Sequence, residues 1–242
     1  MHIVTPETIE QVAWEGYLTP LWTPDQQSWA LGPMPKHAAS LPRVTLGEPV
    51  WWPAATAMET ETGEKWTPPA GDSQYLLLRL ACTLHPPAEG RLRYTEAILA
   101  TYLRPVTGTG QVVAHDLYPR RLTADNEGSF VVGLGPDLRF ANLVRVSLLD
   151  VGAEIEYRRA FPVIQGYGLG ESRVYWRFAH HASHPLLGSQ SVYIVLDAPA
   201  DAGGVRLSVE LVATLETRVG PIRLGLPREA RDHTSRTIGD GR

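Results

Sequence analysis

The segment GVRLSVELVATLETRV, residues 204–219, decides the fold. Its apolar residues recur at every second position, with polar or charged residues between them. A period of two is typical of a β-strand with one buried and one solvated face, because successive side chains point to opposite faces of a strand. The apolar positions are 205, 207, 209, 211, 213 and 215, and the polar positions are Arg206, Ser208, Glu210, Thr214 and Glu216.

The neighbouring segments continue this pattern. SVYIVLD (191–197) is apolar on both faces, which predicts a central strand, and the turn-forming connector APADAGG (198–204) predicts a hairpin between the two strands. RYTEAILATYLR (93–104) also fits a helix with Tyr94, Ile98 and Tyr102 on one face, but its neighbours favour a strand. Further strands are expected at 75–84, 91–104, 112–118, 129–134, 139–149, 154–164 and 173–181.

Short strands separated by turns, without alternating helices, predict an all-β fold. We expect an antiparallel β-sandwich of the Greek-key or jelly-roll type over residues 74–225. Residues 1–73 hold six of the seven tryptophans and predict an irregular, partly helical N-terminal arm, with short helices in TPETIEQVAW (5–14) and TPDQQSWALG (23–32). The polar residues 226–242 predict a flexible C-terminal tail.

Composition excludes several classes of protein. The net charge of the chain is −4, and residues 1–73, with nine acids and three bases, carry −6 of it. The weakly charged remainder does not suggest a nucleic-acid-binding surface, and no apolar run approaches the roughly 18 residues of a membrane span. The single cysteine, Cys82, cannot form an intrachain disulfide, and the N-terminus has no signal peptide, so we expect a cytoplasmic protein.

Three histidines in VYWRFAHHASHPLLGSQSVYIVLDAP (174–199) raise the question of a metal site. In a strand, His180 continues the core face of Val174 and Trp176, whereas His181 points outward. His181 and His184 therefore form the better half of a zinc site, but zinc needs at least one further ligand from elsewhere. A strand end that runs into a turn is the favoured interpretation.

Three glycines in GYGLGES (166–172) do not fit a dinucleotide-binding motif, because another strand follows where that motif needs a helix. A loop that needs positive φ angles is the favoured interpretation.

The tryptophans of the arm are the candidate partner-binding residues, because tryptophan is enriched at interface hot spots. Alternatively, the rings cover the sandwich as part of its own core. The candidates are Trp22, Trp29, Trp51, Trp52 and Trp66.

These observations favour a non-catalytic protein-interaction or assembly module that needs no cofactor. It would bind a partner protein, or a second copy of itself, through the aromatic, acidic arm or through a face of the sandwich. One alternative is a metal-dependent, hydrolase-like enzyme that uses zinc at His180, His181 and His184. Another is a β-domain that binds a small ligand, either a carbohydrate or a lipid.

Overall fold

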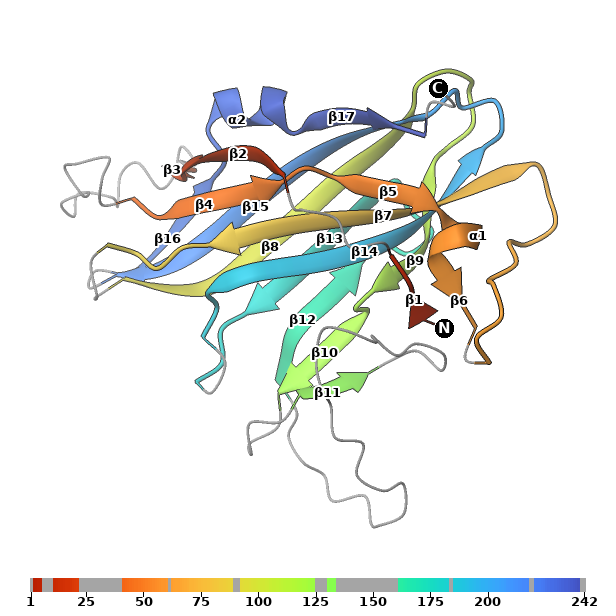
Figure 1. Ribbon diagram of the computed structural model, residues 1–242. Helices are drawn as coiled ribbons and strands as arrows, with labels where there is room; N and C mark the ends of the chain where they lie inside the picture. The colour runs from red at the N-terminus through yellow and green to blue at the C-terminus, as the bar shows by residue number, and fades with distance from the viewer. Residues whose placement is uncertain are drawn as a thin grey trace, which may run out of the picture.

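The chain is an all-β antiparallel sandwich, as predicted, in which two sheets pack face to face around one core (Figure 1). Within the described residues, no helix is long and apolar enough to cross a membrane. The computed structural model describes residues 2–5, 11–21, 41–60, 62–88, 92–124, 130–133, 161–182, 185–217 and 220–239.

The first sheet has six strands in the order β2-β4-β7-β14-β9. The sixth strand, β5, pairs with the same edge of β7 as β4 does, because β14 occupies the other edge of β7 along its whole length. The strands are β2 (Val12–Tyr17), β4 (Arg43–Gly47), β5 (Val50–Pro53), β7 (Ser73–Leu84), β9 (Val113–Tyr118) and β14 (Gly188–Pro199).

The second sheet has nine strands in the order β11-β10-β12-β13-β8-β15-β16-β3, and β17 also pairs with β15. Its outermost strands β10 and β11 extend away from the body of the sandwich (Figure 1). The strands are β3 (Thr19–Pro20), β8 (Arg93–Pro105), β10 (Arg121–Ala124), β11 (Phe130–Gly133), β12 (Phe161–Tyr167), β13 (Arg173–Ala179), β15 (Val205–Thr217), β16 (Gly220–Gly225) and β17 (Ser235–Ile238).

The core lies between the two sheets and follows the predicted period of two. Every second residue of β15, from Val205 to Leu215, is buried in it. The other face of β15 is solvated, since Arg206 and Glu216 are exposed. β14 lies between β7 and β9 and is apolar on both faces, as expected of a central strand, because its outer residues enter a second cluster.

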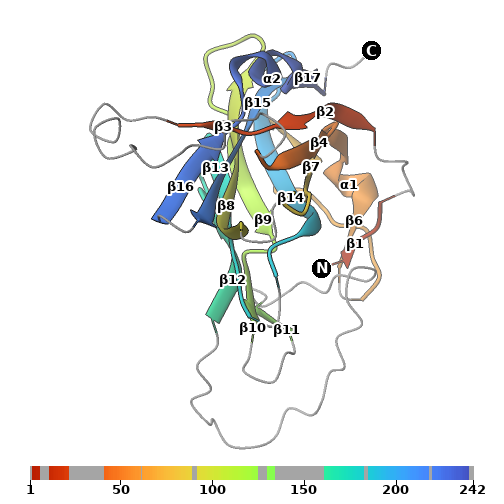
Figure 2. The ribbon, with the colours of Figure 1, turned by 90° about the vertical axis from the view of Figure 1, so that its left-hand side faces the viewer.

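This second cluster covers the outer face of the six-stranded sheet. β1 (His2–Ile3), α1 (Ala54–Ala57) and β6 (Met58–Glu59) lie over that face (Figure 2). The buried members are Ala54, Ala57, Met58, Trp66, Leu77, Tyr118, Tyr193 and Val195.

The predicted hairpin between residues 191–197 and 205–217 is wrong. β14 belongs to the six-stranded sheet and β15 to the nine-stranded sheet, so the connector crosses between the sheets. The crossing uses Gly203 and Gly204, whose φ angles are 59° and 110°. A period of two shows which face of a strand is buried, but it does not show which of two packed sheets the strand joins.

The ends of the chain differ from the expected arm and tail. Val12–Trp14, expected at the end of a helix, belong to β2, and β4 and β5 join the same sheet. The expected flexible tail forms α2 (Arg228–His233) and β17, because Ala230, Thr234 and Ile238 are buried. The expected helix at 23–32 and the expected strand at 139–149 lie outside the described residues, and of 154–164 the structure places 161–164 in β12.

Residues 93–104 lie in β8, which settles the ambiguity of that segment in favour of a strand. The strands expected at 75–84, 112–118, 129–134 and 173–181 correspond to β7, β9, β11 and β13.

Candidate functional site

Three arginines meet at one end of the outer face of the nine-stranded sheet. The register of β8 and β15 places Arg104 directly opposite Arg206, and the register of β8 and β13 places Arg173 opposite Tyr102. Tyr102 and Arg104 are two residues apart in one strand, so their side chains share a face. All three arginine side chains are exposed, and we call Arg104, Arg173 and Arg206 the arginine cluster.

A row of aromatic rings holds Arg173 in place. Its guanidinium carbon lies over the Tyr102 ring at 5.2 Å from the centroid and over the Tyr175 ring at 5.9 Å. Tyr175 stacks in turn on Tyr167, with centroids 4.7 Å apart and an angle of 15° between the planes. Because cation–π contacts restrain the guanidinium without using its N–H donors, Arg173 is oriented and still able to bind an anion.

No described carboxylate neutralises the arginine cluster. No ion pair joins any of its members to a carboxylate within the part of the chain that the structure describes. On the same sheet, Arg177 pairs with Glu96 at 2.5 Å, and Arg93 pairs with Glu216. Like charges directly opposite each other in a sheet are destabilising, so Arg104 and Arg206 cost stability that no described acidic group recovers.

A cleft of about 300 Å³ opens beside the cluster. It forms because β13 begins at Arg173, opposite Tyr102, whereas β8 continues to Pro105. Two of the arginines and several smaller polar groups line it. The lining residues are Tyr102, Leu103, Arg104, Pro105, Gly110, Gln111, Val112, Ser172 and Arg173.

Glycines allow close packing in and behind the segments that line this cleft. Gly168 has a φ of 95°, and a Cβ there would lie 2.2 Å from the carbonyl oxygen of Arg173. A Cβ on Gly110 would lie 2.5 Å from Cγ of Pro199. Gly168 and Gly170 have the positive φ angles expected of a loop in GYGLGES, although Gly166 and Tyr167 still belong to β12. The loop that follows delivers Ser172 and Arg173 to the cleft.

Hydroxyl groups continue the polar surface on the far side of the cluster. The register of β15 and β17 places Thr237 opposite Arg206 and Ser235 opposite Ser208. Ser208 is also opposite Tyr102 of β8. The end of this face therefore offers guanidinium and hydroxyl donors together, which is the chemistry that binds oxyanions.

The predicted tryptophans lie elsewhere and pack against the protein. Trp51 and Trp52 are on opposite faces of β5, and they pack on the main core and on the second cluster respectively. Trp66 is 7% exposed, and its ring meets Tyr75 and His115 edge-on at 5.5 and 6.2 Å. Their role in partner binding stays a prediction; Trp22 and Trp29 lie outside the described residues.

The predicted zinc ligands are only partly described. His180 follows the end of β13, and its backbone N–H donates to the carbonyl oxygen of Thr95 at 3.0 Å. Burial lowers the pKa of His180, and the neighbouring Arg93 guanidinium and His181 ring lower it further. Among the described residues, no three His, Cys, Asp or Glu side chains are grouped to hold a metal ion, and His184 lies outside these residues, so the zinc site stays a prediction.

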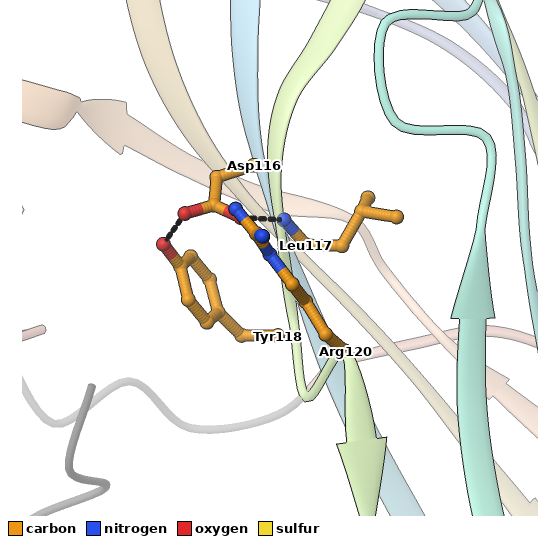
Figure 3. A network of polar contacts seen from close by, with 4 residues as sticks. All are labelled: Asp116, Leu117, Tyr118 and Arg120. Carbon is orange, nitrogen blue, oxygen red and sulfur yellow. Dashed lines mark hydrogen bonds and ion pairs between the residues drawn. The ribbon is translucent and has the colours of Figure 1, made fainter. Parts of the chain in front are cut away.

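A separate polar network surrounds Asp116 at the end of β9 (Figure 3). Its carboxylate accepts hydrogen bonds from the backbone N–H of Leu117 at 2.8 Å, from the Tyr118 hydroxyl and from Nε of Arg120 at 2.7 Å. All its partners are within four residues, just before the chain crosses from β9 to β10 in the other sheet. The network therefore holds this crossing in shape.

The arginine cluster was not found from the sequence. Its members come from three strands that are distant in the chain, and each alone is an ordinary residue on the solvated face of a strand. The period of two places Arg206 on that face, but only the register between strands brings it beside Arg104.

Comparisons with known proteins show only remote structural likeness. No protein-family model and no curated protein sequence matches the chain. The NetB toxin of Clostridium perfringens, in its membrane-inserted form, has a TM-score of 0.34 at 9% identity over 81% of this chain and 94% of that chain. The C-terminal domain of the Streptococcus agalactiae AgI/II polypeptide BspA scores 0.29 at 10% identity, over 76% of this chain and 49% of that one. These scores support no inference about function.

Proposed function

We propose that the chain is a non-catalytic protein-interaction module that binds an acidic partner protein on the outer face of the nine-stranded sheet. The observation that carries this proposal is the arginine cluster, three exposed guanidinium groups without a described carboxylate partner. Charge complementarity favours an acidic partner, because such a surface would remove the repulsion between Arg104 and Arg206.

The chemistry of the cluster suits binding rather than proton transfer. Guanidinium groups remain protonated in proteins, so they donate hydrogen bonds and supply charge but do not act as general acids or bases near neutral pH. The half-buried rings of Tyr102 and Tyr175 orient Arg173 before a partner arrives. Less entropy is therefore lost on binding, which raises the affinity.

The sandwich face has more support than the tryptophan arm as the binding surface. Trp51, Trp52 and Trp66 already pack against the two clusters of the protein, so their rings have less free area for a partner. The same packing leaves the carbohydrate-binding alternative without an exposed tryptophan among these three. We propose a cytoplasmic location, since the one cysteine, Cys82, is buried and can form no intrachain disulfide.

The test is a titration of the ¹⁵N-labelled protein with an unstructured peptide of glutamate residues, followed by NMR. We expect shifts at Arg104, Arg173 and Arg206 in about 10 mM salt, and weaker binding as salt shortens the screening length. The double variant R104E/R173E should lose most of the affinity. The matched control is R223E, because Arg223 is an exposed arginine on the same face of the sheet but outside the cluster.

Binding that survives in R104E/R173E, or that R223E weakens equally, would contradict the proposal. Sedimentation of the wild-type protein across a range of concentrations tests whether the partner is a second copy of the chain. A dimer that R104E/R173E dissociates would make a second copy of the chain the acidic partner.

A further inference from the structure

We propose that the cleft beside the arginine cluster binds a phosphate monoester carried by a serine or threonine of the partner protein. This inference rests on the proposed function and names the chemical group that the face recognises. It follows from the charge of the cluster, the orientation of Arg173 and the position of the cleft.

The charge of the cluster favours a phosphate over a carboxylate. Arg104, Arg173 and Arg206 place three positive charges within two neighbouring rows of the sheet. A single carboxylate brings one negative charge and two acceptor oxygens. A phosphate monoester brings about −1.5 to −2 at neutral pH and three acceptor oxygens, so it satisfies more of the free guanidinium donors.

The cleft offers hydrogen-bond donors beside the charges. Arg104 and Arg173 both line the cleft, where Ser172 adds a hydroxyl and Gln111 adds an amide. The Arg173 guanidinium makes its described contacts with rings and makes no described hydrogen bond, so its N–H donors are available. Gly168 lets the preceding loop lie close to the backbone of Arg173, because a Cβ there would lie 2.2 Å from the carbonyl oxygen of Arg173.

The layout of the face favours a phosphorylated protein over a nucleic acid. A nucleic-acid strand needs a basic stripe along its length and open aromatic faces on which bases stack. Here the three arginines of the cluster gather at one end of the sheet, and Arg223, which is also exposed on this face, lies apart from them toward the other end of β15. The rings of Tyr102, Tyr175 and Tyr167 are already occupied by Arg173 and by each other. A single phosphate on a side chain therefore fits the arginine cluster better than a nucleic-acid strand does.

The acidic groups near the cluster leave its arginines unpaired. Glu171 comes directly before Ser172 of the cleft, and Glu210 comes two residues after Ser208 in β15. Neither forms an ion pair with the cluster in the described structure. Arg177, two residues from Arg173, is neutralised by Glu96. The sheet therefore neutralises an arginine next to the site and leaves the arginines of the site free for a ligand.

The experiment compares three versions of one short, capped peptide that carry phosphoserine, glutamate or serine at the central position. Binding is measured by NMR titration of the full chain. We expect the phosphoserine peptide to bind roughly tenfold more tightly than the glutamate peptide, in line with one further charge-assisted hydrogen bond. The R173Q and R104Q variants should each lose roughly tenfold, whereas R223Q should bind like the wild type. Circular dichroism and thermal unfolding of each variant confirm that it is folded.

Three further results would overturn the phosphate assignment. Equal binding of the phosphoserine and glutamate peptides, lost together in R173Q, would keep the acidic-partner function and remove the phosphate. Inorganic phosphate that binds as tightly as the peptide would indicate a site for a free anion. A single-stranded oligonucleotide that binds more tightly than the peptide would assign the face to nucleic acid. If none of the peptides binds, both this inference and the proposed function fail.

Discussion

Neutralising Arg206 should make the protein more stable and a poorer binder. Arg206 stands directly opposite Arg104, and both side chains are exposed. Like charges at such a pair cost about 0.2–1 kcal/mol, and opposite charges contribute a similar amount. We therefore expect R206Q to raise the free energy of unfolding by about 0.5 kcal/mol and R206E by about 1 kcal/mol at low salt. For a chain of this size, 1 kcal/mol corresponds to a rise in Tm of about 2–4 °C.

The assay is thermal and urea unfolding of the wild type, R206Q and R206E at low salt and at about 1 M salt, where the screening length falls to about 3 Å. The gain in stability should largely disappear at high salt. R223Q is the control, because Arg223 is opposite the uncharged Thr214 and its removal relieves no described repulsion. A loss of stability in R206E, or a gain that salt does not affect, would refute the argument that the cluster is held at a cost.

Further predictions concern the loop beside the cleft, the core and the charge of the ligand. Gly168→Ala should destabilise the protein by about 1–3 kcal/mol and weaken phosphopeptide binding, because its φ is 95° and the new Cβ would meet the Arg173 carbonyl. Gly170→Ala, with a φ of 77° but no atom within 4 Å, should cost less in the same unfolding assay. Trp176→Phe should cost about 2–4 kcal/mol in denaturant unfolding, because the fully buried ring donates from Nε1 to the Pro119 carbonyl at 2.9 Å; a loss below 1 kcal/mol would contradict this. Phosphopeptide binding should weaken between about pH 7 and 5, since the second pKa of the phosphate is about 6 while the guanidiniums stay charged, and a flat profile in NMR titrations would count against a dianion.

The tryptophan-rich segment shows how composition can mislead about a boundary. Its prolines and aromatic residues predict an irregular arm, yet β2, β4 and β5 add three strands to the six-stranded sheet. The two adjacent rings of Trp51 and Trp52 face opposite sides of β5, as side chains in a strand must. Each ring therefore reaches a different apolar cluster, which explains why two tryptophans stand side by side.

The crossing between the sheets illustrates a second limit. Turn-forming residues at 198–204 show that the chain turns, but the same residues serve a hairpin and a crossing. Strand pairing excludes the hairpin, since β14 is paired with β7 over its full length and with β9 on its other edge. No edge of β14 was left for β15.

By itself, the sequence determined the all-β class, most strand positions and the buried faces of β13 and β15. These properties depend on the alternation of side chains along one strand, which local sequence carries directly. The tertiary structure decided which sheet each strand joins, that residues 12–17, 43–47 and 50–53 belong to a sheet, and that three distant arginines share one surface. These properties depend on the register between strands, which is set by packing between residues far apart in the chain, and no local pattern records it.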